Sequence, residues 1–116
     1  MAPHIRRTDV LVGPHGADMT NALGMHAGAS VLEVIPVHTQ GCPCTKFRDV
    51  FAMEPRIFHY TAHSRNASYA TAAARRVAGT YNADLYLPPA VLAAALQQVV
   101  DVGGDPARYR FRNFQY

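Results

Sequence analysis

Residues 9–36 read DVLVGPHGADMTNALGMHAGASVLEVIP, and this stretch decides the fold. It begins with a short β-branched run at 9–13 and ends with a second apolar run at 30–35, both typical of buried parallel strands. Between them, residues 18–25 carry apolar side chains at helical spacing, and Gly28 ends that segment. This order of strand, helix and strand predicts a βαβ unit, for which a right-handed crossover is usual.

The remainder of the chain continues the alternation of strands and helices. Residues 37–55 are irregular and predict a long loop with one helical turn, and residues 57–60 predict a third strand. Residues 67–78 are rich in alanine and predict a helix that Gly79 ends. Pro88 and Pro89 then open the last helix.

The last helix carries one apolar stripe, and the residues after it are aromatic and basic. The stripe consists of Leu92, Ala95, Leu96 and Val99, and Gly103 and Gly104 end the helix. The sequence therefore predicts a single α/β, Rossmann-like domain with a mostly parallel sheet over residues 1–102. Residues 103–116 form an aromatic and basic tail, which we expect to pack on the domain.

Length and composition limit the possible classes of protein. The chain has 116 residues, 49% hydrophobic, which is enough for one domain with a core. Its net charge of +3 is spread over short pairs of arginines, so nucleic-acid binding is not favoured. No apolar run has the length of a signal-peptide core or of a membrane span, and an anchor or targeting segment is expected only upstream of Met1.

Polar and small residues gather where the first strand meets the helix. In open α/β sheets, ligands bind beyond the carboxyl ends of the strands, and a helix N-terminus there favours a phosphate group. An acidic residue about twenty positions after the glycine turn is typical of a contact with ribose hydroxyls. The candidate binding residues are Gly13, His15, Gly16, Ala17, Thr20, Asn21 and Glu33.

Two other interpretations remain open from the residues alone. The glycines can simply shape a tight turn, with Asp18 or Thr20 capping the helix and Glu33 in water. The other is a metal site, although its His-x3-Cys-x-Cys spacing is not a common zinc pattern, and we predict no metal. Its ligands would be His38, Cys42 and Cys44, with His59 or His63.

The sequence of residues 8–36 resembles the signature of glycosyltransferase family 61. The matching parts are the strand followed by His15-Gly16-Ala17, the pair Thr20-Asn21, and the segment GASVLEVIP at residues 28–36. A weaker similarity covers residues 82–85 and the last helix. The family includes plant xylosyl- and arabinosyltransferases and protein O-linked N-acetylglucosaminyltransferases.

The resemblance implies the nucleotide-sugar-binding, C-terminal half of a GT-B enzyme. Such an enzyme transfers a pentose or N-acetylglucosamine from a UDP-sugar to a glycan or protein acceptor with inversion, and needs no cofactor. The candidate residues would hold the donor, with Glu33 near the ribose or base. The acceptor domain and the catalytic base, whose identity is unknown, would lie upstream, so we expect the isolated chain to be inactive. The alternative is a non-catalytic Rossmann-like remnant or interaction module.

Two departures and one further motif accompany the resemblance. The family usually has glycine at the position of Asp18 and a large apolar residue at that of Gly24, which indicates altered donor binding. The sequence Asn66-Ala67-Ser68 is an N-glycosylation motif and agrees with the Golgi or ER lumen that the resemblance implies.

Overall fold

The computed structural model is a layered α/β domain built on a sheet of four parallel strands in the order β1-β2-β3-β4. The structure describes residues 3–35, 46–65 and 86–116, apart from the side chains of Asp18 and Lys46. The strands are β1 (Val10–Pro14), β2 (Ser30–Ile35), β3 (Phe58–His63) and β4 (Asn113–Gln115). The predicted α/β class and the parallel sheet are confirmed, and the sheet is consistent with a Rossmann-like fold.

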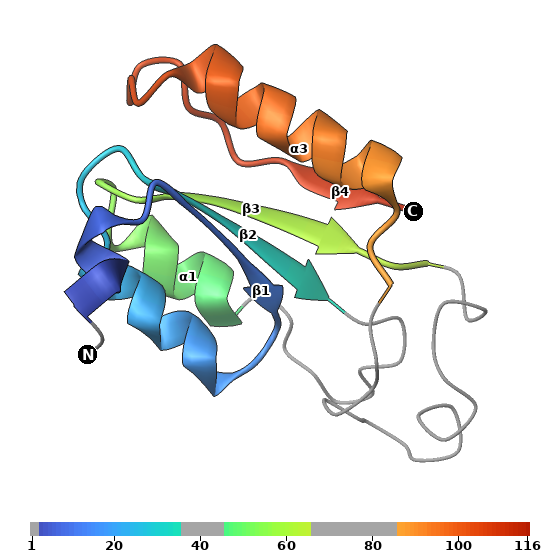
Figure 1. The fold of residues 1–116 in the computed structure, drawn as a ribbon, viewed down its shortest axis with the longest axis horizontal. Helices are drawn as coiled ribbons and strands as arrows, with labels where there is room; N and C mark the ends of the chain where they lie inside the picture. The colour runs from blue at the N-terminus through green and yellow to red at the C-terminus, as the bar shows by residue number, and fades with distance from the viewer. Residues whose placement is uncertain (1–2, 36–45, 66–85) are drawn as a thin grey trace.

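Helical segments cover both faces of this sheet (Figure 1). The 3₁₀ helices η1 (Pro3–Arg7) and η2 (Ala17–Gly24) and the helix α1 (Lys46–Ala52) lie on one face. The helix α3 (Pro89–Val102) lies on the other face. Because the strands are consecutive and parallel, the connection that contains α3 has the opposite hand to the two connections before it.

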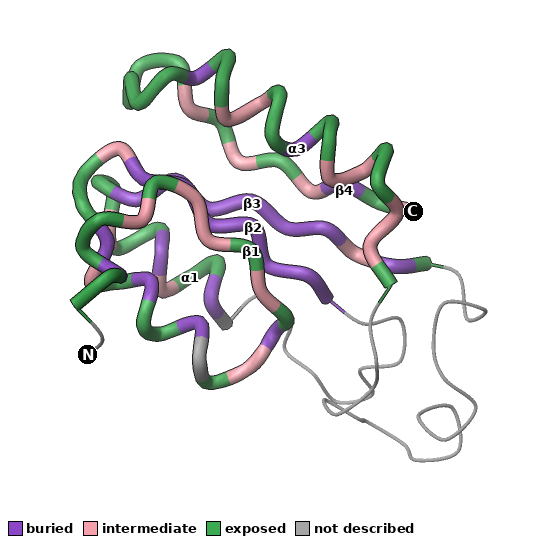
Figure 2. Tube along the Cα trace, viewed as in Figure 1, coloured by how far each residue is buried: buried purple, intermediate pink, exposed green. Residues whose placement is uncertain are grey.

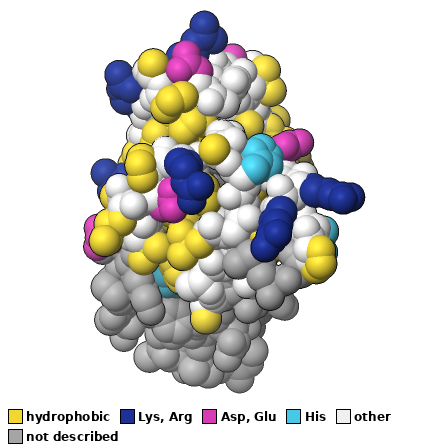
Figure 3. All heavy atoms as spheres, turned by 90° about the vertical axis from the view of Figure 1, so that its left-hand side faces the viewer, with side chains coloured by type: hydrophobic (Ala, Val, Ile, Leu, Met, Phe, Trp, Pro, Cys, Tyr) yellow, Lys and Arg dark blue, Asp and Glu magenta, His cyan; other side chains and the backbone are white. Residues whose placement is uncertain are grey.

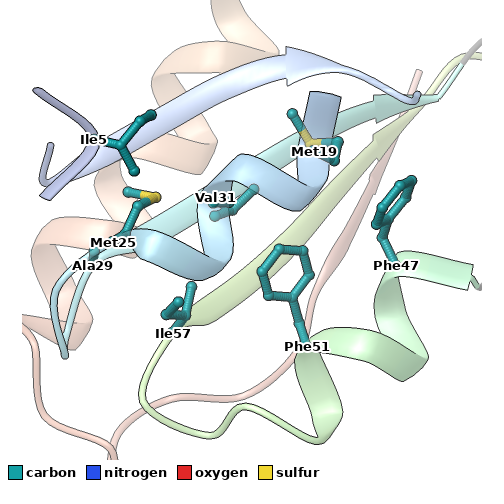
Figure 4. Packing of buried hydrophobic residues seen from close by; sticks show 9 residues of the cluster. Ile5, Met19, Met25, Ala29, Val31, Phe47, Phe51 and Ile57 are labelled. Carbon is teal, nitrogen blue, oxygen red and sulfur yellow. The ribbon is translucent and has the colours of Figure 1, made fainter. Parts of the chain in front are cut away.

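Each face of the sheet has its own apolar core. Figure 4 shows the first core, in which side chains from η1, η2 and α1 pack around Val31 of β2. The second core joins β2, β3 and β4 to α3, with Ala95 and Val102 as its buried helical residues. All six residues of β2 are buried, so this strand is the centre of the molecule (Figure 2). A strand covered on both faces explains the continuous apolar run in its sequence.

Several predicted elements differ from the structure in detail. Residues 17–24 form a 3₁₀ helix in place of the expected α-helix. Within the expected loop 37–55, α1 makes about two turns over residues 46–52. The expected strand 57–60 is longer and includes Thr61, Ala62 and His63. The predicted helix at residues 67–78 lies outside the described residues.

The C-terminal helix agrees with its predicted limits but not with its full stripe. Gly103 adopts the left-handed conformation at φ 57° and ends α3, which is the usual role of a glycine at this position. Leu96, which we predicted to be buried, is 39% exposed. It follows Ala95, which is buried, and so points about 100° away around the helix axis.

The segment that the sequence presents as a tail contributes to the sheet. Asn113–Gln115 forms β4 and pairs with residues 61–63 of β3. Phe114 is buried in the core beneath α3, so the aromatic residues of this segment pack on the domain. In the described part of the chain, no helix has the length and apolar character needed to cross a membrane.

Candidate functional site

Three polar residues, from β2, β3 and the position just after β1, meet in the interior of the molecule. Glu33 is fully buried on β2, between Gly13 of β1 and Thr61 of β3 in the strand register. One of its carboxylate oxygens pairs with Nδ1 of His15, and the other lies 3.0 Å from Nε2 of His59. We call these three residues, His15, Glu33 and His59, the His–Glu–His cluster.

Aromatic residues of α1 hold both imidazole rings. The ring of His15 meets Phe47 edge-on, with the ring centres 5.4 Å apart. The ring of His59 stacks on Phe51 at 4.9 Å. Both phenylalanines are buried, so the cluster lies in an apolar setting where an unpaired carboxylate would be very unfavourable. The two imidazole N–H groups are therefore necessary partners of Glu33.

The backbone places His15 at the end of the sheet where ligands bind in this class of fold. Its N–H donates to the carbonyl of Val34 at 2.8 Å, which extends the pairing of β1 and β2 by one residue. His15 therefore lies beyond the carboxyl end of β1. Its side chain is 8% exposed, and Nδ1 is the nitrogen that faces Glu33.

This arrangement gives His15 a defined chemical character. A carboxylate that accepts a hydrogen bond from Nδ1–H fixes the tautomer and the orientation of the ring. In this tautomer Nε2 of the neutral ring is an acceptor, and an imidazolium carries an N–H at both nitrogens. The cluster therefore positions a histidine for acid–base chemistry or for phosphate binding.

The structure gives Gly13 a role in packing. A Cβ atom at this position would lie 2.6 Å from the terminal methyl carbon of Met19, which is buried in the first core. The absence of a side chain on Gly13 lets η2 insert Met19 against the sheet. A side chain at Gly13 would therefore require the flexible end of Met19 to move, and Gly13 lies beside Glu33 in the register.

Gly16 differs from Gly13, because a Cβ atom there would have no described neighbour within 4 Å apart from the adjacent residues. Ala17 follows it as the first residue of η2 and is exposed. Thr20 and Asn21 are also exposed, and the Thr20 hydroxyl donates to the carbonyl of Ala17 at 2.8 Å. The residues after His15 therefore form an open surface at the N-terminus of η2.

Glu33 is the candidate whose surroundings differ most from the sequence-based expectation. We expected it near the ribose or the base of the donor, but its carboxylate is buried and already holds two imidazoles. Its described contacts are those of a residue that orients His15. The sequence distance from Gly13 could not distinguish these roles.

His59 was not expected as a partner of Glu33. We considered it only as a metal ligand, whereas its Nε2 faces the Glu33 carboxylate. The available signal was a histidine inside an otherwise apolar strand, since a buried polar side chain requires a partner. Among the described residues, no group of three His, Cys, Asp or Glu side chains is arranged to hold a metal ion. His38, Cys42, Cys44 and Asn66 lie outside the described residues.

Comparisons with known proteins add no relative. No protein-family model, no curated protein and no solved structure matches this chain.

Proposed function

We propose that this chain is the UDP-sugar-binding half of an inverting glycosyltransferase of the kind that its signature resembles. In this proposal the diphosphate binds beyond the carboxyl end of β1, at His15, Gly16 and Ala17. The observation that carries the proposal is the buried pairing of His15 with Glu33, which orients an imidazole at this edge. A Golgi or ER-lumen setting and a glycan or glycoprotein acceptor belong to the same proposal.

The chemistry of the leaving group fits this position. When the sugar is transferred, negative charge develops on the diphosphate of UDP, and fixed donors aimed at that charge lower the barrier. An imidazolium at His15 carries an N–H at Nε2 as well as the one that faces Glu33. The first N–H groups of η2 lack partners within the helix and supply further donors.

The open space at Gly16 supports the same placement. Apart from the adjacent residues, no described atom lies within 4 Å of the position where a Cβ would be, so packing among the described residues does not require glycine here. At φ 163° the backbone is extended, so Gly16 does not require glycine for its conformation either. A ligand that approaches the backbone closely would explain a glycine here, because even a methyl group would obstruct it.

A second candidate function is an interaction module without catalysis. It is supported by the apolar side chains that the structure leaves exposed on β1 and α3. Val12 is 41% exposed and Val100 is 70% exposed. Exposed apolar surface is typical of a face that meets another protein or domain. Binding of UDP separates the two functions, since only the first requires it.

The test is isothermal titration calorimetry of the purified chain with UDP. We expect saturable binding that His15→Ala weakens by about 10-fold or more, as expected for the loss of a charge-assisted hydrogen bond. Gly16→Ala should also weaken binding while leaving the free energy of unfolding unchanged, because its methyl group enters open space. The matched control is His26→Ala, which removes an exposed histidine that pairs with Asp9 ahead of β1.

Each outcome has a defined meaning. Binding that both site variants weaken and the control does not would support the donor-binding function. Absence of binding by a folded chain at millimolar UDP would reject it and favour the interaction module. Equal binding by the wild type and Gly16→Ala would show that the diphosphate does not bind at the N-terminus of η2.

A further inference from the structure

The His–Glu–His cluster contains two imidazoles, and the proposed function uses only that of His15. Nε2 of His59 lies 3.0 Å from one carboxylate oxygen of Glu33, and the other oxygen pairs with Nδ1 of His15. His59 is 2% exposed, and its ring contacts those of Phe51 and Phe111. With so little accessible surface, His59 can influence a ligand at the carboxyl edge of β1 only through Glu33.

Burial limits the net charge of this cluster. With both imidazoles neutral, ionised Glu33 leaves one uncompensated negative charge in an apolar setting. A proton on one imidazole balances this charge, whereas protons on both leave one positive charge in excess. The two histidines therefore compete for a single proton, and the surroundings of each ring decide which of them holds it.

The surroundings of His59 oppose a positive charge. Its Nδ1 is buried and makes no hydrogen bond to any described residue. In the neutral ring that donates from Nε2 to Glu33, Nδ1 is an acceptor, and protonation would turn it into an N–H donor. A buried donor without a partner costs more when its group is charged, so the added proton is disfavoured at His59.

The surroundings of His15 suit the charged form better. Nδ1 faces Glu33, so one N–H of an imidazolium is already paired with a carboxylate. The residue lies just beyond β1, and the exposed start of η2 follows it. His15 is 8% exposed against 2% for His59, so water or an anionic ligand at this edge can approach its ring more readily.

Other charged groups near the cluster do not change this order. Arg48 and Asp49 of α1 are adjacent, exposed and of opposite charge, so their effects on the cluster largely cancel. The Tyr109 hydroxyl pairs with the backbone of His59 and not with its ring. The remaining titratable residues on the elements packed against the cluster are His63, at the carboxyl end of β3, and Asp18 and Lys46, whose side chains lie outside the described residues.

We propose that His59 is a positioning residue, which stays neutral and directs the positive charge of the cluster to His15. By donating to Glu33 it holds the carboxylate toward Nδ1 of His15, and its unpaired Nδ1 opposes a charge on its own ring. The edge of β1 thereby presents an imidazolium, which selects an anionic ligand. That this anion is the diphosphate of UDP rests on the proposed function, whereas the assignment of the charge does not.

Two-bond proton–nitrogen NMR spectra of the chain with isotope-labelled histidine test the charge assignment without a ligand. The nitrogen shifts distinguish an imidazolium from each neutral tautomer, and His15→Gln and His59→Gln identify the two signals. As pH falls from about 8 to about 5, we expect His15 to gain a second N–H while His59 keeps one, at Nε2. The exposed residue His26 serves as the reference ring that becomes charged. A charge on His59 before or together with His15, or a His15 that stays neutral throughout, would overturn the proposal.

Two variants of His59 test how it acts on His15. His59→Gln keeps an N–H donor for Glu33 but cannot hold the added proton, so His15 should become charged over the same pH range as in the wild type. A shift of this range to higher pH would show that His59 competes for the proton, against the proposal. His59→Phe keeps the contact with Phe51 but removes the donor, and we expect neutral His15 to become a mixture of both tautomers. A single unchanged tautomer in folded His59→Phe would overturn the positioning role.

The calorimetric titration with UDP separates this inference from the proposed function. His59→Phe should weaken UDP binding by about 5-fold although residue 59 does not reach the ligand, and His59→Gln should restore the affinity of the wild type. Equal losses in both variants would contradict a positioning role exerted through the donor to Glu33. If the wild type does not bind UDP, the proposed function fails, while the NMR spectra still decide which histidine of the cluster carries the charge.

Discussion

Glu33 places a carboxyl group between two imidazoles in the apolar interior of the sheet. It accepts from His15 and His59, and none of its surface is exposed. In Glu33→Gln the amide keeps one acceptor oxygen but turns an NH₂ group toward the other imidazole. We expect the free energy of unfolding to fall by about 2 kcal/mol, the usual cost of a broken hydrogen bond to a buried charged group.

Urea unfolding measures this loss. The matched control is Glu54→Gln, which removes a carboxylate that is paired with Arg56 near the surface. That change should alter the unfolding free energy by less than about 0.5 kcal/mol. Equal effects of the two substitutions would show that the interior pairing adds nothing to stability.

At the scale of single elements, the Tyr109 side chain pairs with backbone groups of β3 that no neighbouring strand satisfies. β4 pairs only with residues 61–63, and the Tyr109 hydroxyl takes the place of a strand at His59. It donates to the carbonyl of His59 at 2.6 Å and accepts from its N–H at 3.2 Å. Tyr109→Phe leaves both backbone groups without this partner, and we expect a loss of about 1–2 kcal/mol in unfolding free energy.

Tyr60 provides the control for the same chemical change. Its hydroxyl is buried and has no partner among the described residues, and burial raises its pKa to about 12. Tyr60→Phe removes an unpaired polar group, so stability should stay constant or rise by about 1 kcal/mol. Tyr109→Phe should therefore lower the urea midpoint, whereas Tyr60→Phe should leave it unchanged or raise it. A fall of the same size in both would contradict the edge role of Tyr109.

At the scale of the whole molecule, stability depends on pH through two histidines whose protonation has opposite effects on the free energy of unfolding. The hydrogen bond from His26 to the carbonyl of Ala27, followed by its pairing with Asp9, raises the pKa of His26 above 6.5. Burial and the nearby charge of Arg65 lower the pKa of His63 below 6.5. Protonated His26 therefore favours the folded state, and protonated His63 disfavours it.

The pH trends of two variants test this opposition. The contribution of His26 is fully present below pH 6.5 and is lost as pH rises through its raised pKa. His26→Gln should therefore lose most stability at the acidic end of a series from about pH 5 to about pH 8. The penalty at His63 grows as pH falls below 6.5, so His63→Gln should gain stability at that end. Parallel trends would refute these assignments.

The whole molecule also bears on the choice of binding partner. The surface in Figure 3 shows arginine side chains spread over this end of the molecule, with no single basic patch on this face. That nucleic acid is not a favoured partner stays a prediction from the sequence.

The sequence alone determined those features that depend on neighbouring residues. Continuous apolar runs predicted the strands β1 and β2, and Gly103 predicted the end of α3, because both follow local patterns. The predicted burial is correct for β2 but wrong for β1, which lies at the edge of the sheet with Val12 41% exposed. The glycines near His15 similarly indicated a turn at the carboxyl edge. Their separate roles were not readable, since the packing of Met19 on Gly13 requires the position of η2.

Only the tertiary structure decided which distant residues meet. Glu33 and His59 are 26 positions apart, and they touch because β2 and β3 pair in one register. The tail joins the sheet as β4, and α3 lies on the opposite face from α1. The physical reason is that strand partners and helix faces are chosen by the total burial of the chain, which no local window of sequence contains.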